Sequence, residues 1–255
     1  MKRMHSCLLL LGLAAVGCNS TGVGNPPGVD TVSLPLIIAS DPEVEPEPTD
    51  TGEQLDASSL RHAVLVFGEL RFIACDTPDN DAVIDGEYAV DLAQNTVEPP
   101  LPRVALPAAG FCGIDATLAP ATTPPSLAGR SMFFSGLRTD GALFLMFADM
   151  PGTLRMRPRL DRVWPTDGKH GWLWALRPRR WLLPSELDTA DSTPLDGIGN
   201  VIAIDVNRHP ILYQAIRARI ARRSTLHIDL NDNEQLDPNE RTGSAYIGQG
   251  LDTLD

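Results

Sequence analysis

Short runs of alternating apolar residues, separated by prolines, are the feature that most constrains how this 255-residue chain can fold. The longest run extends from Leu60 to Cys75, where residues such as Val64 and Val66 recur with a two-residue period. That period is typical of a strand with one buried face, and a run of this length favours a bent or bulged strand.

Further strands are expected at short intervals after this one. They span Glu87–Leu92, Phe111–Leu118, Ser131–Arg138, Ala142–Met150, Thr153–Arg157 and Gly171–Arg177. The tripeptide Thr139-Asp140-Gly141 supplies turn residues for a hairpin between two of them. Prolines fall in the gaps, where a missing N–H group removes no bond from a sheet. The pattern predicts a mainly β fold, an antiparallel β-sandwich.

One C-terminal amphipathic helix is expected from Pro210 to Arg223. Leu212, Ile216 and Ile220 recur every four residues and form one apolar stripe. Such a basic helix can lie on an anionic membrane, but the narrow stripe favours packing against the sheet.

The first residues indicate export. Lys2 and Arg3 precede an apolar stretch, Leu8 to Val16, that is too short to span a bilayer. Because Gly17 and Cys18 follow, the segment resembles a bacterial lipoprotein signal. The resemblance implies cleavage before Cys18, lipid attachment to its thiol and anchoring to a membrane. Asn19, which is not the Asp that retains many such proteins at the inner membrane, favours the outer membrane.

The composition divides the chain into four parts. Residues 1–17 form the signal peptide, and residues 18–58 form a flexible acidic and Pro-rich tether with one strand expected at 31–39. Residues 59–190 form the β-sandwich domain. Residues 191–255 are expected to form a C-terminal helix and an EF-hand-like loop packed on the sandwich.

The order of segments also resembles a family of bacterial lipoprotein domains of unknown function with a prealbumin-like, or transthyretin-like, β-sandwich. The resemblance rests on the segment from Leu106 to Phe111, on the hairpin from Ser131 to Met150 and on the stretch from Trp172 to Trp181. It covers Leu60 to Leu187. It implies a fold but no known activity.

Two cysteines remain after processing. Cys7 leaves with the signal and Cys18 takes the lipid, so Cys75 and Cys112 are expected to form a disulfide in an oxidising compartment. A metal-thiolate or redox site is the alternative, but no CxxC motif supports it.

The segment from Asp229 to Glu240 has the spacing of an EF-hand calcium loop. Counted from Asp229, oxygen-bearing side chains occupy positions 1, 3, 5 and 9, and a Glu stands at 12. The expected ligands are Asp229, Asn231, Asn233, Gln235 through its carbonyl, Asp237 and Glu240. Glu234 occupies position 6, where Gly normally makes the sharp turn, and the flanks are not helical. The sequence therefore predicts a lone Ca²⁺ loop with atypical flanks, and an Asx-rich turn is the alternative.

Every tryptophan lies in one Arg-rich window, residues 155–181. Trp164, Trp172, Trp174 and Trp181 could stack on a glycan or peptidoglycan fragment. Alternatively they fill the core while Arg side chains cover its edge, which is the favoured interpretation.

The remaining features bear on the class of function. The net charge of −12, which grows when Lys2 and Arg3 are removed, disfavours nucleic acid as a partner. No hydrolase, zinc-protease, P-loop or dinucleotide motif occurs, and the histidines are scattered singly. We therefore expect a non-catalytic, lipid-anchored, calcium-assisted lipoprotein of the cell envelope that presents a binding or structural surface to an envelope glycan or protein. A glycan-binding module is the alternative, and an envelope hydrolase comes third.

Overall fold

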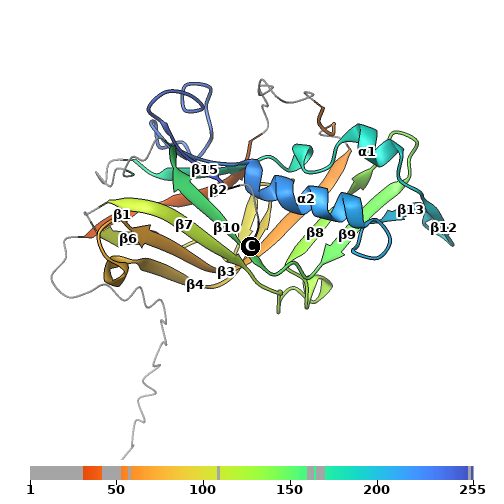
Figure 1. Ribbon diagram of the computed structural model, residues 1–255, viewed down its shortest axis with the longest axis horizontal. Helices are drawn as coiled ribbons and strands as arrows, with labels where there is room; N and C mark the ends of the chain where they lie inside the picture. The colour runs from red at the N-terminus through yellow and green to blue at the C-terminus, as the bar shows by residue number, and fades with distance from the viewer. Residues whose placement is uncertain are drawn as a thin grey trace, which may run out of the picture.

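The computed structural model describes residues 31–41, 53–56, 59–107, 110–159, 164, 170–251 and 254. Within them the protein is mainly β and sandwich-like, as expected, and one strongly curved sheet holds most strands (Figure 1). The strands are β1 (Thr31–Leu34), β2 (Leu36–Ser40), β3 (Leu60–Ala74), β4 (Ala82–Asp91), β5 (Thr96–Glu98), β6 (Val104–Pro107), β7 (Phe111–Leu118), β8 (Met132–Leu137), β9 (Leu143–Ala148), β10 (Gly152–Pro158), β11 (Trp172–Leu176), β12 (Thr193–Leu195), β13 (Gly199–Ala203), β14 (Ser224–Ile228) and β15 (Tyr246–Gly250). The α-helices are α1 (Pro184–Asp188) and α2 (Pro210–Arg222). The expected signal peptide and Cys18 lie outside the described residues.

The main sheet is mostly antiparallel. Its strands follow the order β12-β13-β9-β8-β3-β7-β10-β15-β14-β11-β2, and β4 and then β5 are attached to β3. Two neighbouring pairs, β13–β9 and β11–β2, run parallel. β1 and β6 form a separate two-stranded antiparallel sheet.

Strand β3 is long enough to pair with different strands along its two parts. Its first part pairs with β8 and its second part with β7, and the register shifts between Phe67 and Glu69. A β-carbon at Gly68, between those residues, would lie only 2.6 Å from the Cβ of Ala119. Glycine therefore permits the close approach at the bend, and the predicted bent strand is confirmed.

Aromatic side chains join distant parts of the curved sheet across one core. Phe67 and Phe72 of β3 pack against Trp174 and Trp172 of β11, with ring centroids 5.5 and 6.1 Å apart. All four rings are buried. Because β3 and β11 are far apart in the strand order, these contacts close the sheet into a sandwich.

Helix α2 covers the core, as its sequence pattern predicts. Leu212, Ile216 and Ile220 are buried, while Ile211 is exposed. The helix is in contact with β10 and with β15. A β-carbon at Gly250 of β15 would collide with the Ala221 carbonyl, so glycine lets the end of α2 approach this strand. None of the helices in the described ranges is long and apolar enough to span a membrane.

The C-terminal segment contributes more than a helix and a loop. Besides α2, residues 191–255 supply β12 to β15, and β13, β14 and β15 pair with β9, β11 and β10. The segment therefore extends the sheet itself, whereas the sequence predicts only packing on it.

The N-terminal segment forms two strands in place of the one expected at residues 31–39. Pro35 separates β1 from β2, and its carbonyl accepts a hydrogen bond from the Trp172 N–H group at 2.9 Å. Proline has no N–H to donate to a sheet, so the ladder changes partner there: β1 pairs with β6 and β2 with β11.

The expected disulfide between Cys75 and Cys112 is present. It joins the residue after β3 to the second residue of β7, with the two Cα atoms 5.0 Å apart. The two cysteines are 37 positions apart, so the bond closes a loop that contains β4, β5 and β6.

Replacing both cysteines with alanine is expected to lower the free energy of unfolding by about 3 to 4 kcal/mol, because the unfolded chain regains the entropy of the open loop. Urea denaturation monitored by tryptophan fluorescence measures this change. Wild-type protein treated with a reductant should unfold at the same urea concentration as the double variant. Equal midpoints for the oxidised wild type and the variant would contradict the prediction.

Candidate functional site

The segment from Asp229 to Glu240 connects β14 to β15 and projects from the sheet as a dark-blue loop in Figure 1. Its first and last residues are 2% and 0% exposed, whereas residues 231–235 are exposed. The N–H of Asp229 donates to the carbonyl of Gly171 at 3.0 Å. The loop is thus fixed at its two ends and open to solvent in the middle.

The two buried carboxylates organise the backbone of the loop. Asp229 accepts hydrogen bonds from the N–H groups of Asn233 (3.2 Å) and Glu234 (2.9 Å). Glu240 accepts from the N–H groups of Leu230 (2.7 Å) and Asp237 (2.9 Å). Both ends of the loop therefore direct carboxylate oxygens toward the backbone between them.

The three remaining candidate side chains meet one another. The amide nitrogens of Asn231 and Asn233 donate to Oδ2 of Asp237 at 2.7 and 3.0 Å. Their amide oxygens accept from backbone N–H groups, that of Asn233 from Gln235 at 2.8 Å. The loop thus brings together Asn231, Asn233 and Asp237, three of the predicted ligands.

The sharp turn at position 6 forms without glycine. Glu234 has a φ of 61°, in the left-handed region, and Asp232 has a φ of 55°. A side chain in this region costs about 1 to 2 kcal/mol, and local hydrogen bonds offset the cost. The bond from the Glu234 N–H to Asp229 is such a contact.

A divalent cation would need more than the carboxylates of this loop. Among the described residues, no three His, Cys, Asp or Glu side chains are grouped closely enough to hold a metal ion by themselves. Hard cations such as Ca²⁺ take six to eight oxygen ligands, which include amide and backbone carbonyl oxygens. Asp229, Asp237 and Glu240 are therefore not grouped as metal ligands in this conformation, and Asn231, Asn233 and the Gln235 carbonyl could complete a set with them only after the loop rearranges.

His227 supports the loop from within the sheet. Its Nδ1 lies 2.8 Å from the Glu240 carbonyl and its Nε2 lies 2.9 Å from the Thr225 hydroxyl. A carbonyl only accepts, so Nδ1 carries the proton and Nε2 accepts from Thr225. Burial lowers the pKa of His227 to about 4, and the positive charges of Arg177 and Arg241 lower it further. The hydrogen bond to the Glu240 carbonyl acts in the opposite direction and raises the pKa.

The structure corrects the glycan-binding interpretation of the tryptophans. Trp164, Trp172, Trp174 and Trp181 are between 0% and 2% exposed, so no indole face is open to stack on a sugar ring. Trp164 also donates its ring N–H to the Ile247 carbonyl at 2.7 Å. The four side chains belong to the core, which is the interpretation that the sequence favoured.

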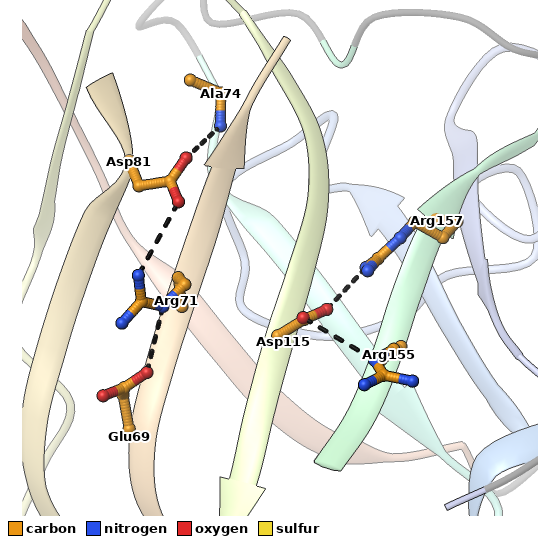
Figure 2. Close-up of polar contacts among 7 residues, drawn as sticks. All are labelled: Glu69, Arg71, Ala74, Asp81, Asp115, Arg155 and Arg157. Atoms are coloured by element: carbon orange, nitrogen blue, oxygen red, sulfur yellow. Dashed lines mark hydrogen bonds and ion pairs between the residues drawn. The ribbon is translucent and has the colours of Figure 1, made fainter. Parts of the chain in front are cut away.

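A band of charged side chains crosses β3, β7 and β10 on the sheet surface (Figure 2). Its members are Glu69, Arg71, Asp81, Asp115, Arg155 and Arg157. Arg71 pairs with Glu69 at 3.1 Å, and Asp115 pairs with Arg157 at 2.6 Å. Because cations and anions alternate and neutralise one another, the band forms a solvated face and offers no concentrated charge to a ligand.

Four histidines, His62, His170, His209 and His227, lie in the described part of the chain, each in a different place. His62 pairs with Asp91 at 3.2 Å, but its side chain is exposed and stacks on Phe133 on the sheet surface. His227 is held by the two hydrogen bonds above. His170 and His209 each line a cavity: Nδ1 of His170 lies 3.7 Å from Oδ1 of Asp232, and Nε2 of His209 lies 3.2 Å from the Asp191 carbonyl.

The loop also contacts residues that its sequence pattern did not indicate. Arg241, directly after Glu240, pairs with Asp41 at the end of β2, and Arg177 pairs with the same carboxylate. The sequence gives no sign of this contact, because Asp41 begins an acidic run and Arg177 is 136 residues away.

Comparison with known proteins does not identify the chain. No protein-family model, curated protein or solved structure matches it.

Acidification is expected to destabilise the protein through His227. Its pKa is about 4 when folded and near 6.5 when unfolded, so only the unfolded state takes up a proton between these values. The contribution of His227 to the free energy of unfolding is fully present above pH 6.5. On acidification below this value it falls by up to about 1.4 kcal/mol per pH unit. Chemical denaturation in EDTA at pH 7.5 and 5.5 measures the loss.

His227→Gln should show a smaller loss of stability between these two pH values, because it removes the titrating ring. His62→Gln, which changes an exposed imidazole, serves as the control and should behave like wild type. An unchanged pH dependence in His227→Gln would contradict the assignment.

Proposed function

We propose that this chain is a non-catalytic lipoprotein of the cell envelope, in which Ca²⁺ bound by the loop from Asp229 to Glu240 stabilises a lipid-anchored β-sandwich that presents a binding or structural surface. The observation that carries the proposal is the convergence of the loop's oxygen-bearing side chains between two buried carboxylates. Membership of the prealbumin-like lipoprotein family is part of the same proposal, and the mainly β fold supports it.

Calcium binding would require the loop to rearrange, because its three carboxylates are not grouped as metal ligands. The amide nitrogens of Asn231 and Asn233 now donate to Asp237. Rotating each amide about its last side-chain bond would direct its oxygen toward a cation beside Asp237, but it would break the bonds that these oxygens now accept from the N–H groups of Asn233 and Gln235. Only three of the ligand side chains are charged, so we expect weak affinity, about 10⁻⁴ to 10⁻³ M as in extracellular modules.

Lipid anchoring is supported by the sequence at Cys18. The apolar segment, Gly17 and the cysteine coincide, and the disulfide between Cys75 and Cys112 is consistent with an oxidising compartment. More than one acyl chain on Cys18 would give stable anchoring, with the outer membrane favoured over the inner one. The partner would be an envelope glycan or protein bound at a surface other than the buried tryptophans.

Ca²⁺ is expected to raise the melting temperature of the protein. A ligand that binds only the folded state adds about 1.4 kcal/mol of stability at tenfold excess over Kd. Glu240→Gln should abolish the shift, because it removes the charge of the expected bidentate ligand. Gln is preferable to Ala here, since it keeps an acceptor for the Leu230 or Asp237 N–H group.

Asp232→Asn is the matched control for this experiment. It removes one negative charge from the same loop at position 4, which is not a ligand position, so the calcium-dependent shift should persist. No shift in wild type up to about 10 mM CaCl₂, tenfold above the weakest expected Kd, would refute calcium binding, as would an equal shift in Glu240→Gln.

Cys18→Ala is expected to abolish acylation and to release the protein from membranes, because the thiol is the attachment point for the lipid. Metabolic labelling with a radioactive fatty acid and membrane fractionation test both effects. Cys7→Ala, within the expected signal peptide, should leave them unchanged. Membrane association of Cys18→Ala equal to that of wild type would rule out this anchor.

A further inference from the structure

Strands β8, β9, β13 and β12 form one end of the main sheet (Figure 1), and both of their faces are apolar. The inner face contributes core residues such as Phe134, Phe144 and Ile202, each 0% exposed. The alternate residues lie on the opposite side, which we call the outer apolar face. They are Phe133, Ser135, Leu137, Leu143, Leu145, Phe147, Thr193, Leu195, Val201 and Ala203. Eight of these ten residues are apolar and none is charged.

The outer side of the same sheet is charged where other strands form it. The second part of β3, β7 and β10 carry the band of charged side chains described above (Figure 2), in which Asp115 pairs with Arg157. An antiparallel sheet with one face on the core normally alternates apolar residues with polar ones that face water. The charged band follows this rule, and the outer apolar face departs from it. The departure indicates that a partner covers the outer apolar face.

The side chains of this face form rows across the strands. Phe133 lies opposite Phe147, and their rings stack with centroids 4.3 Å apart. In the next row Leu145 lies between Ser135 and Ala203. Because Ser and Ala are shorter than Leu, Leu145 projects between two recesses. A second copy related by a two-fold axis can place its Leu145 in one recess and receive the Leu145 of the first copy in return, which makes the face self-complementary.

Exposed apolar side chains gather at this face. Of the seven large ones in the described part of the chain, Phe147 and Leu195 belong to the face and are 43% and 51% exposed. Ile198 and Val206, in the loops that follow β12 and β13, are 59% and 54% exposed. Scattered exposed apolar residues are normal, whereas a group of them marks an interaction site. Pro194 in the edge strand β12 has no N–H group and disfavours extension of the sheet, so the partner packs on the face.

Composition and charge select a second copy of this chain as the partner. Homodimer interfaces are more apolar than the rest of the surface, whereas interfaces with transient partners are about as polar as that surface. Two copies with a net charge of −12 each repel one another, and the repulsion is least where the contacting residues carry no charge. An anionic membrane would be repelled by the same net charge and would bring polar headgroups against apolar side chains.

The size of the face sets the strength of the contact. Four strands about 4.8 Å apart, up to about six residues long at about 3.4 Å per residue, cover roughly 20 by 20 Å. This is about half of the roughly 800 Å² that each partner buries in a standard stable interface. We therefore expect a weak, concentration-dependent dimer with a Kd of about 10 µM.

We propose that the outer apolar face of β8, β9, β13 and β12 packs on the same face of a second copy across a two-fold axis. The contact is sheet on sheet, like the packing inside a β-sandwich. It extends the proposed function by naming a surface and its partner. It depends on neither Ca²⁺ nor the lipid, so the failure of either leaves it intact.

Sedimentation velocity of the full chain tests the dimer. Cys18 is replaced by alanine in every sample, so that an attached lipid cannot associate the copies. This parent protein should change from monomer to dimer between about 1 and 100 µM. Phe147→Lys should raise the Kd about tenfold or more, because dimerisation would then bury an unpaired charge. Leu251→Lys is the matched control: Leu251 is 40% exposed and lies outside the face, so the variant should dimerise like the parent.

A second variant and a change of salt sharpen the test. Leu195→Lys changes a half-exposed side chain on the short edge strand, where folding tolerates the change, and it should also weaken the dimer. Raising NaCl from about 0.05 to 0.5 M should strengthen the dimer, because salt screens the repulsion between the copies and the face contains no ion pair to weaken.

Three results would overturn the proposal. The first is a parent protein that stays monomeric up to about 100 µM, tenfold above the expected Kd. The second is a dimer that both Phe147→Lys and Leu195→Lys leave unchanged, since it then uses another surface. The third is a monomer that floats with phosphatidylcholine vesicles and loses this binding in Phe147→Lys, which would assign the face to lipid.

Discussion

The packing of Trp172 and Trp174 against Phe72 and Phe67 is the interaction on which the rest of the structure depends. These rings close the curved sheet on itself, and each aromatic side chain buries a large apolar area. Strands β14 and β2 then pair with the two edges of β11. The candidate loop follows β14 and the N-terminal segment contains β2, so both are positioned by the strand that carries the two indoles.

Much of the fold could be predicted from local patterns. The two-residue alternation in β3, the four-residue stripe in α2 and the expected pairing of Cys75 with Cys112 all led to features that the structure contains. These signals lie in single segments of the chain. The strand and helix signals depend on the burial of one face, and the disulfide follows from the exclusion of Cys7 and Cys18 as partners. None of them requires knowing which strands become neighbours.

The parts that could not be predicted depend on contacts between distant segments. β15 has the sequence Tyr-Ile-Gly-Gln-Gly, which lacks a clear alternation, and it forms by pairing with β10 and β14, which are distant in sequence or follow an irregular register. The ligand-like spacing of the loop could be recognised in the sequence, but the left-handed turn at Glu234 and the ion pairs of Asp41 with Arg177 and Arg241 could not. Each is decided by hydrogen bonds or ion pairs that no local pattern contains.

The parallel pairing of β2 with β11 has a consequence for the order in which the chain folds. Its partner residues lie far along the sequence, as the 136-residue separation between Asp41 and Arg177 illustrates, and chains emerge from the N-terminus first. Strand β2 therefore cannot pair until β11 has been synthesised. The ion pair between Asp41 and Arg241 cannot form until the chain is almost complete. The segment next to the proposed acylation site stays without its sheet partner during most of synthesis, and its docking is among the last steps of folding.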